Sequence, residues 1–128
     1  MAVDASAILA ILLKEPDADR FDTALADAGG GVMSAVNHWE VLVRAWASFG
    51  DPGRDAAEGV LDRLGVKIVP ATDEDARAAA SAFERFGKRS GGRLNLGDCF
   101  AYALARREGH GLLFKGGDFP KTDVLAAG

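Results

Sequence analysis

Four acidic residues stand where a carboxylate is expected to face the interior of the protein. Asp4 follows the apolar stretch MAV, Asp98 lies in the nearly all-apolar segment RLNLGDCFAYALARR, and Asp118 follows LLFK and a glycine turn. Glu40 lies near the front of the amphipathic segment SAVNHWEVLVRAW. Burial of an unpaired carboxylate costs several kcal/mol. Each acid must therefore be neutral, be paired with a base, or be bound to a cation.

If they gather in one place, the four carboxylates predict a site for a hard divalent cation. Like charges raise one another's pKa, so such a cluster persists at neutral pH only with a compensating cation. Magnesium or manganese fits best, because these ions prefer carboxylate and water oxygens. The two histidines, His38 and His110, have no ligand spacing between them and are expected to be structural or surface residues. Acids that hold such an ion beside a basic rim suit in-line hydrolysis of a phosphodiester without a side-chain nucleophile.

Taken singly, each acid also has an ordinary structural interpretation. Asn95 and Asp98 have the spacing of a capping box at the start of a helix, and Asn95 is also expected to orient Asp98. Asp4 can stand beside the start of a helix, Glu40 can face solvent, and an aspartate such as Asp118 is common in loops. The metal-site interpretation therefore depends on the convergence of the four positions.

The composition is that of one globular domain, which we expect to span residues 1–128. Of the 128 residues, 48% are hydrophobic and 27% are charged. The longest nearly apolar run, residues 5–13, is too short to span a membrane, and the start lacks the basic residues of a signal peptide. A cytoplasmic protein is expected. The single cysteine, Cys99, excludes an intrachain disulfide and a cysteine-cluster zinc site.

Charge is unevenly distributed along the chain. The net charge of −4 by itself argues weakly against a nucleic-acid binder. However, residues 1–84 hold 15 acids and 7 bases, whereas residues 85–128 hold 4 acids and 8 bases. Lys88, Arg89 and Arg93 cluster around the glycine-rich loop GKRSGG. They predict a patch that binds phosphate groups, and a solvated surface is an equally good interpretation.

Alternation of strands and helices predicts the fold. We expect strands at residues 1–4, 32–33, 66–70 and 112–114, and helices at residues 6–13, 16–28, 34–49, 56–64, 72–86 and 95–105. This order is typical of an α/β fold, here a three-layer sandwich with a short-stranded, mainly parallel central sheet. In such sheets, sites form where the carboxyl ends of the strands meet a crevice, and Asp4 and Asp118 stand at such ends.

Three local predictions concern the helices. Ser6, Ser34 and Thr72 are expected to cap the helices that follow them. The segment GDPGR is expected to be a loop, because proline and glycine interrupt regular structure. The inward stripe of the third helix is expected to consist of Val36, Trp39, Val43 and Ala47.

Four stretches of the sequence resemble the PIN-domain ribonucleases, and within them the VapC-type toxins of bacterial toxin–antitoxin pairs. They are VDASAILAILLKEP, the segment around Glu40, LNLGDCFAYALA, and LLFKGGDF followed by TD, and they run nearly from end to end. The resemblance implies a PIN-like domain that pairs as a homodimer, cleaves RNA with Mg²⁺ or Mn²⁺, and is held inactive by a cognate antitoxin. It implies Asp4, Glu40, Asp98 and Asp118 as the catalytic, metal-binding acids, with the Ser6 hydroxyl supporting Asp4.

Two features depart from the pattern of this family. Gly117 stands where close relatives usually carry a second acid or amide, and the segment NHWE replaces a Thr- and Val-rich sequence. Asp123, in KTD, is a further candidate acid, so the sequence leaves open whether Asp118 or Asp123 completes the site. The departures also leave open a catalytically weak PIN-fold binding module that acts through its antitoxin or another protein partner. A phosphoryl-accepting receiver domain is disfavoured, because it needs paired acids after the first strand and Ala5 follows Asp4.

Overall fold

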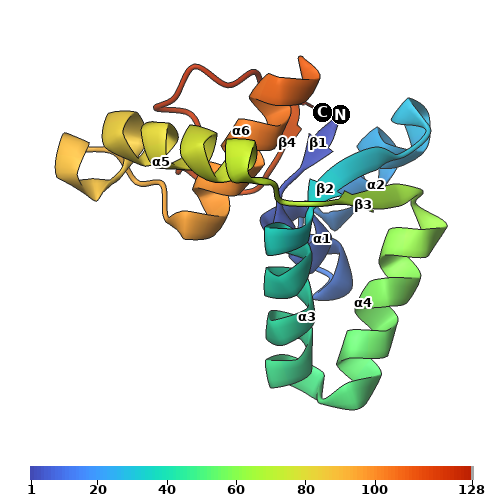
Figure 1. The fold of residues 1–128 in the computed structure, drawn as a ribbon. Coiled ribbons are helices and arrows are strands. Elements are labelled where there is room, and N and C mark those ends of the chain that lie inside the picture. The colour runs from blue at the N-terminus through green and yellow to red at the C-terminus, as the bar shows by residue number, and fades with distance from the viewer. Residues whose placement is uncertain (128) are drawn as a thin grey trace.

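The computed structural model describes residues 1–127, which fold as an α/β sandwich around one parallel sheet (Figure 1). Within these residues the strands are β1 (Ala2–Val3), β2 (Gly31–Ser34), β3 (Val66–Val69) and β4 (Leu112–Leu113). The helices are α1 (Ala5–Leu12), α2 (Ala18–Ala28), α3 (Ala35–Phe49), α4 (Asp51–Arg63), α5 (Asp73–Phe86) and α6 (Leu96–Glu108), with a 3₁₀ turn at Lys88–Ser90. The sheet order is β3-β2-β1-β4, and every pairing is parallel. The predicted fold class and parallel sheet are confirmed.

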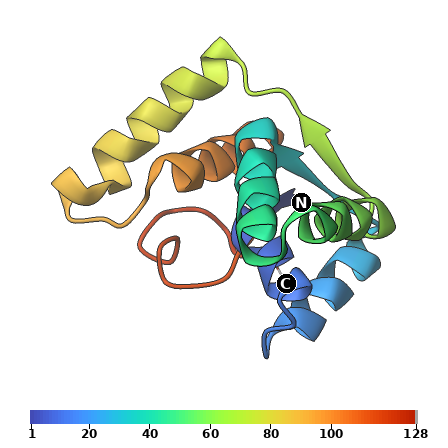
Figure 2. The same ribbon diagram turned by 90° about the horizontal axis from the view of Figure 1, so that it is seen from below.

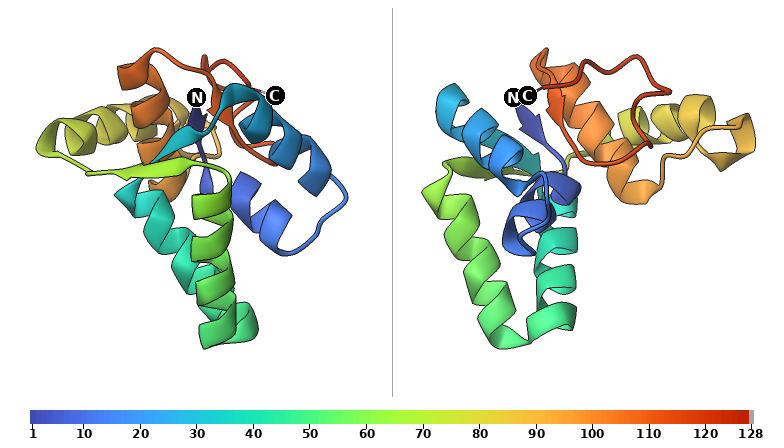
Figure 3. Two further views of the ribbon diagram at one scale, coloured as in Figure 1. Left: turned by 90° about the vertical axis from the view of Figure 1, so that its right-hand side faces the viewer. Right: turned by 180° about the vertical axis from the view of Figure 1, so that it is seen from behind.

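Helices cover both faces of the sheet. From β1 the chain moves to β2 and then to β3, and the helices of these two crossovers, α1 to α4, pack on one face. The last crossover returns past β2 and β1 to β4, which places α5 and α6 on the opposite face. Figure 3 shows this separation from two sides, with α3 and α4 as a hairpin that projects beyond the sheet. The topology therefore sets the carboxyl ends of β1 and β4 next to each other.

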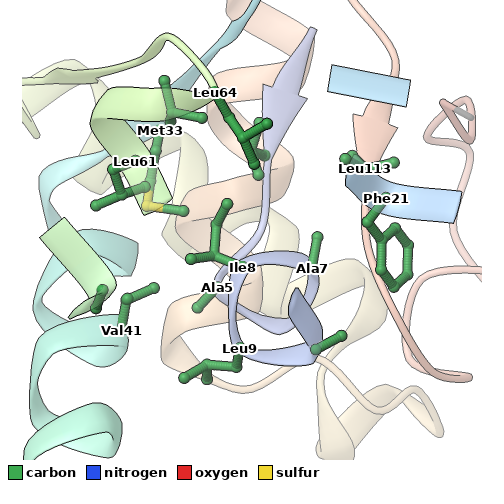
Figure 4. Close-up of a cluster of buried hydrophobic side chains, with 14 of the residues drawn as sticks. Ala5, Ala7, Ile8, Leu9, Phe21, Met33, Val41, Leu61, Leu64 and Leu113 are labelled. Carbon is green, nitrogen blue, oxygen red and sulfur yellow. The ribbon is translucent and has the colours of Figure 1, made fainter. Parts of the chain in front are cut away.

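The face covered by α1 to α4 holds one of two apolar cores. Buried side chains from these four helices and from the sheet meet there, including Ile8, Leu9, Phe21, Met33 and Val41 (Figure 4). Burial of a large apolar side chain stabilises the fold by about 1.5–3 kcal/mol. This core holds α1 and α3 against the sheet, and these two helices carry Ser6 and Glu40.

α6 is buried along most of its length, as its apolar sequence predicts. It packs against both the sheet and α5, so that Cys99 and Tyr102 are both covered. A capping box fixes its start: the Asp98 N–H donates to Asn95 Oδ1 at 2.9 Å, and the Asn95 N–H donates to Asp98 Oδ2 at 3.0 Å. Gly109, with φ 68°, ends the helix in the left-handed conformation that favours glycine. The acid of this helix is thus placed by local geometry.

Two other helices begin as predicted. Ser34 caps α3 by accepting the Val36 N–H at 3.1 Å, and Thr72 forms a capping box with Asp75 at the start of α5. Both carboxylate oxygens of Asp75 also accept from Arg107, at 2.8 and 2.9 Å, which ties α5 to α6. In residues 1–127, no helix has the length and apolar character that a membrane crossing requires.

The segment GDPGR is helical, so the prediction of a loop there is wrong. α4 begins at Asp51, directly after Gly50, and Pro52 occupies its first turn, where a missing backbone N–H costs nothing. Gly53 is buried against α3, so closely that a Cβ atom at this position would collide with the backbone carbonyl of Ala45. Proline and glycine here allow a tight connection between two helices instead of ending one.

α3 buries a different stripe from the predicted one. Asn37, Val41 and Ala45 face the core. Trp39 and Val43 of the predicted stripe are instead 63% and 40% exposed. The prediction followed the larger apolar side chains, whereas the fold turns a small residue and an amide inward. α3 therefore presents an exposed apolar face.

Candidate metal centre

A cleft of about 370 Å³ opens at the carboxyl edge of the sheet, and the four predicted acids line it. β2 pairs on one side of β1 and β4 on the other, so the strand order reverses between β1 and β4. Open parallel sheets form their ligand sites in the crevice at such a reversal. Asp4 follows β1, Asp118 follows β4, and the other two acids come from α3 and from the first turn of α6. Figure 2 shows the segment after β4 curling beside α1, which begins directly after Asp4, and α6, which carries Asp98 in its first turn.

Asp4 is buried at the end of β1 and is held by Ser6. The Ser6 N–H and Oγ–H both donate to Asp4 Oδ2, at 3.0 and 2.6 Å. The Lys115 N–H donates to Ser6 Oγ at 2.9 Å, so the loop after β4 is tied to Asp4 through this serine. Asp4 itself caps α1, and the prediction of Ser6 as the cap is wrong, because Asp4 is the last extended residue and its carboxylate reaches the first turn. Burial raises the pKa of Asp4, and the hydrogen bonds from Ser6 partly offset this rise.

Glu40 reaches the cleft from the second turn of α3. Asn37 Nδ2 donates to Glu40 Oε1 at 2.8 Å and to the backbone carbonyl of Gly97 at 3.0 Å. Burial raises the pKa of Glu40, the hydrogen bond from Asn37 lowers it, and the neighbouring charge of Asp4 raises it again. Glu40 is therefore partly buried and faces other acids, and its side chain does not stand free in solvent.

Asp98 is 8% exposed and carries the charge that is hardest to accommodate. Burial, together with the charges of the other three acids, raises its pKa to about 7, although the hydrogen bond from Asn95 lowers it. Oδ2 belongs to the capping box, while Oδ1 takes no part in it. The capping interpretation and the metal-site interpretation of Asp98 are compatible, because the cap uses one oxygen and leaves the other for a ligand.

Asp118 completes the cleft from the loop after β4. Its side chain is 44% exposed, and Arg93 Nε lies 3.8 Å from its Oδ1. A Cβ atom at Gly117 would meet Arg93 Nη1 at 3.6 Å, an ordinary van der Waals distance. The loop therefore has room for the second acid that the sequence pattern leads one to expect at this position.

Asp123 lies outside the cleft, whereas Asp118 lines it. The Tyr102 hydroxyl donates to Asp123, and Arg85 and Arg106 pair with it at 3.4 and 3.3 Å. The hydrogen bond from Tyr102 and the two guanidinium groups lower the pKa of Asp123. Asp123 lines a separate pocket with His110. These interactions with Tyr102, Arg85 and Arg106 give Asp123 a structural role.

Acidic side chains outnumber basic ones in the lining of the cleft. Across residues 1–127, no ion pair joins Asp4, Glu40 or Asp98 to a basic side chain, and Lys115 at the rim pairs with Glu15 at 2.9 Å. Buried carboxylates that repel one another fit a hard divalent cation by donor chemistry. In the same described part of the chain, no three His, Cys, Asp or Glu side chains are already arranged to hold a metal ion. The four carboxylates are suitable ligands for such an ion, and their side chains would have to move closer together to bind it.

A larger cavity, of about 570 Å³, lies between α5 and α6 and has different chemistry. Apolar side chains such as Phe83, Leu96 and Phe100 line most of it. Burial raises the pKa of its Cys99 thiol to about 11, so this cysteine is protonated at neutral pH. The acids, and not the size of the cavity, identify the candidate site.

Three residues of the acidic site escaped prediction from the sequence. Arg44 and Lys115 line the cleft, and Asn37 holds Glu40. Asn37 stands three residues before Glu40, a spacing that places two side chains on the same side of a helix. That spacing is a usable signal, whereas the places of Arg44 and Lys115 depend on how α3 and the loop after β4 pack.

Comparison with known proteins identifies the family. The profile of the PIN domain family matches residues 1–125. Ribonuclease VapC of Mycolicibacterium smegmatis is 42% identical over 127 residues, which are 98% of each chain. Ribonuclease VapC30 of Mycobacterium tuberculosis is 41% identical over 125 residues, which are 97% of this chain and 95% of the relative. The crystal structure of Mycobacterium tuberculosis VapC20, a Sarcin-Ricin loop cleaving toxin, matches the fold with a TM-score of 0.79 at 17% identity, covering 96% of this chain and 95% of that one.

An acid-lined cleft at the carboxyl edge of a short parallel sheet, together with these matches, defines the class of protein. The chain belongs to the PIN domain family and, within it, to the VapC ribonucleases. The resemblance carried by the four sequence stretches is thereby confirmed. A binding module with weak catalysis is not favoured, because the relatives that match over nearly the full chain are ribonucleases.

Proposed function

We propose that this chain is an endoribonuclease toxin that hydrolyses RNA phosphodiester bonds with Mg²⁺ or Mn²⁺ and is inhibited by a cognate antitoxin. The observation that carries the proposal is the presence of Asp4, Glu40, Asp98 and Asp118 in one cleft. The names of the relatives, ribonucleases of the VapC type, support RNA as the substrate. The raised pKa values of the three more buried acids support a cation as their partner.

In this proposal, the four acids of the cleft would hold the ion. A divalent ion bound there lowers the pKa of a water ligand and stabilises charge on the leaving oxygen of the RNA. The chain itself orients the acids: Ser6 fixes one oxygen of Asp4, and the backbone of Asn95 fixes one oxygen of Asp98. Such hydrogen bonds to the ligands set their direction and leave the second oxygen of each carboxylate for the cleft.

Cleavage of a mixture of tRNA and rRNA tests the proposal. We expect cutting with Mg²⁺ or Mn²⁺ and none with excess EDTA. Asp4→Asn should lower the rate at least about a hundredfold, because even changes to groups that orient metal ligands cost about 10–100-fold. Asp27→Asn is the matched control, since Asp27 is an exposed acid at the end of α2, and it should cut like the parent. Undiminished cutting in EDTA, or by Asp4→Asn, would end the proposal.

Lys88, Arg89 and Arg93 are proposed to contact RNA phosphates. All three side chains are at least partly exposed, and Arg93 stands at the rim of the cleft beside Asp118. Each phosphate contact on a single strand contributes a slope of about −0.7 to the logarithm of affinity against the logarithm of salt concentration. Arg93→Gln should therefore flatten the salt dependence of KM by about 0.7. An unchanged slope would contradict the contact.

Protein partners are part of the same proposal. Large apolar side chains remain exposed on α3 and at the start of α6, namely Trp39, Trp46, Phe49 and Leu96. Exposed apolar patches mark protein interaction sites, which supports both a cognate antitoxin and pairing into a homodimer. Light scattering is expected to give twice the mass of the chain, and the mass of a single chain at micromolar concentration would contradict the homodimer.

A further inference from the structure

We propose that Asn37 and Gly97 form a seat that positions the Glu40 carboxylate in the cleft. Asn37 contributes a hydrogen bond, and Gly97 contributes the space that a side chain would otherwise fill. Both are positioning residues, because each acts through Glu40. The inference rests on the proposed function, since it takes Glu40 as one of the acids that hold the divalent ion.

The amide of Asn37 joins two helices to the carboxylate. Asn37 is fully buried in α3, three residues before Glu40. Its Nδ2 group has two hydrogens, and it donates to Glu40 Oε1 at 2.8 Å and to the Gly97 carbonyl at 3.0 Å. The carboxylate of Glu40 is thereby held against the first turn of α6, next to Asp98.

Gly97 leaves room for that carboxylate. A Cβ atom at position 97 would fall on Oε1, Oε2 and Cδ of Glu40, far inside van der Waals contact. The backbone conformation at Gly97 does not require glycine, because this residue lies within α6 and is not among the glycines with positive φ. Glycine within a helix is also less favourable than alanine. The space taken by Glu40 therefore explains the glycine.

The environment of Asn37 shows that core stability does not explain the amide. Its Oδ1 is buried and accepts no hydrogen bond from any donor in residues 1–127. A buried acceptor without a partner lowers stability, so an apolar side chain of similar size would suit the core better. The donors that Asn37 supplies to Glu40 and Gly97 account for its presence.

Two variants remove the two parts of the seat separately. Gly97→Ala displaces the carboxylate, and Asn37→Leu removes the donor while it keeps the number and branching of the side-chain heavy atoms. Gly59→Ala is the matched control, because Gly59 lies within α4 and a methyl group there would meet only open space, so alanine changes helix propensity alone. The measurements are Mn²⁺ binding by calorimetry, urea unfolding in EDTA, and RNA cleavage.

Both seat variants should bind Mn²⁺ at least about tenfold more weakly and unfold at or above the urea midpoint of the parent. Gly59→Ala should bind Mn²⁺ like the parent.

A double variant tests whether Gly97 acts through Glu40. In a Glu40→Ala background, Gly97→Ala should weaken Mn²⁺ binding no further, because no carboxylate remains to be displaced. A further loss in that background would overturn the seat. A drop in the urea midpoint of both seat variants that matches their loss of binding would also overturn it, because the residues would then be structural.

Glu40→Gln separates failure of the seat from failure of the metal centre. If Glu40→Gln weakens Mn²⁺ binding while Gly97→Ala and Asn37→Leu bind like the parent, the seat is wrong and the metal centre stands. If Glu40→Gln also binds like the parent, then Glu40 holds no ion, and the seat falls together with that part of the proposed function.

Discussion

Asp98→Asn is expected to abolish RNA cleavage and, at the same time, to make the metal-free protein more stable. In the folded chain the pKa of Asp98 is raised from 3.8 to about 7, mainly by burial. Above pH 7 the folded protein must therefore hold an ionised carboxylate that the unfolded chain accommodates more easily, and each pKa unit corresponds to about 1.4 kcal/mol. Asparagine is neutral and can still accept the Asn95 N–H, so the capping box is kept. We expect the free energy of unfolding at pH 8 to rise by about 1–3 kcal/mol, less than the full shift because the carboxylate faces an open cleft.

Urea unfolding in EDTA at several pH values measures this gain. The folded-state pKa lies above the unfolded value, so the parent loses the stability in question as the pH rises from about 4 to 7. The advantage of Asp98→Asn should therefore be small near pH 4, grow up to pH 7 and stay level above it. Asp27→Asn, a change at an exposed acid outside the cleft, should show no such trend. A variant that cuts RNA normally, or that is less stable than the parent at pH 8, would contradict the placement of Asp98.

Local rules predicted most of the helices and strands. The capping boxes at Asn95 and Thr72 could be predicted because their hydrogen bonds join residues three apart. The same rules failed where packing decides. Pro52 and Gly53 have the composition of a loop, yet Pro52 lies in the first turn of α4 and Gly53 packs against the backbone carbonyl of Ala45 in α3.

The acids of the cleft could be predicted from the sequence, but their surroundings could not. The carboxyl ends of parallel strands meet at one edge of the sheet, so the sequence predicts that Asp4 and Asp118 lie close together. The choice between Asp118 and Asp123 depends on Tyr102 and two arginines that draw Asp123 to another surface.

The residues that hold Glu40 could not be predicted from the sequence for a similar reason. The hydrogen bond from Asn37 to the Gly97 carbonyl joins residues sixty positions apart, so no local pattern marks it. The outward turn of Trp39 follows from the same geometry, because α3 turns Asn37 inward to reach α6. The acids of the site were thus easier to predict than the residues that orient them, such as Asn37 and Gly97.

Manganese is expected to reverse the order of stability between the parent and Asp98→Asn. An ion that binds the folded chain alone stabilises it by about 4.1 kcal/mol at a concentration of about 1,000 times Kd, which exceeds the gain of about 1–3 kcal/mol expected for Asp98→Asn. Ionised carboxylates are the binding form, so the gain of the parent should grow as the pH rises through about 7, the raised pKa of Asp98. Asp98→Asn lacks this carboxylate and should gain little at any pH. Urea unfolding at pH 6 and pH 8, with Mn²⁺ or with EDTA, gives the comparison; an equal gain in both proteins would place the ion away from Asp98 and leave its burial unexplained.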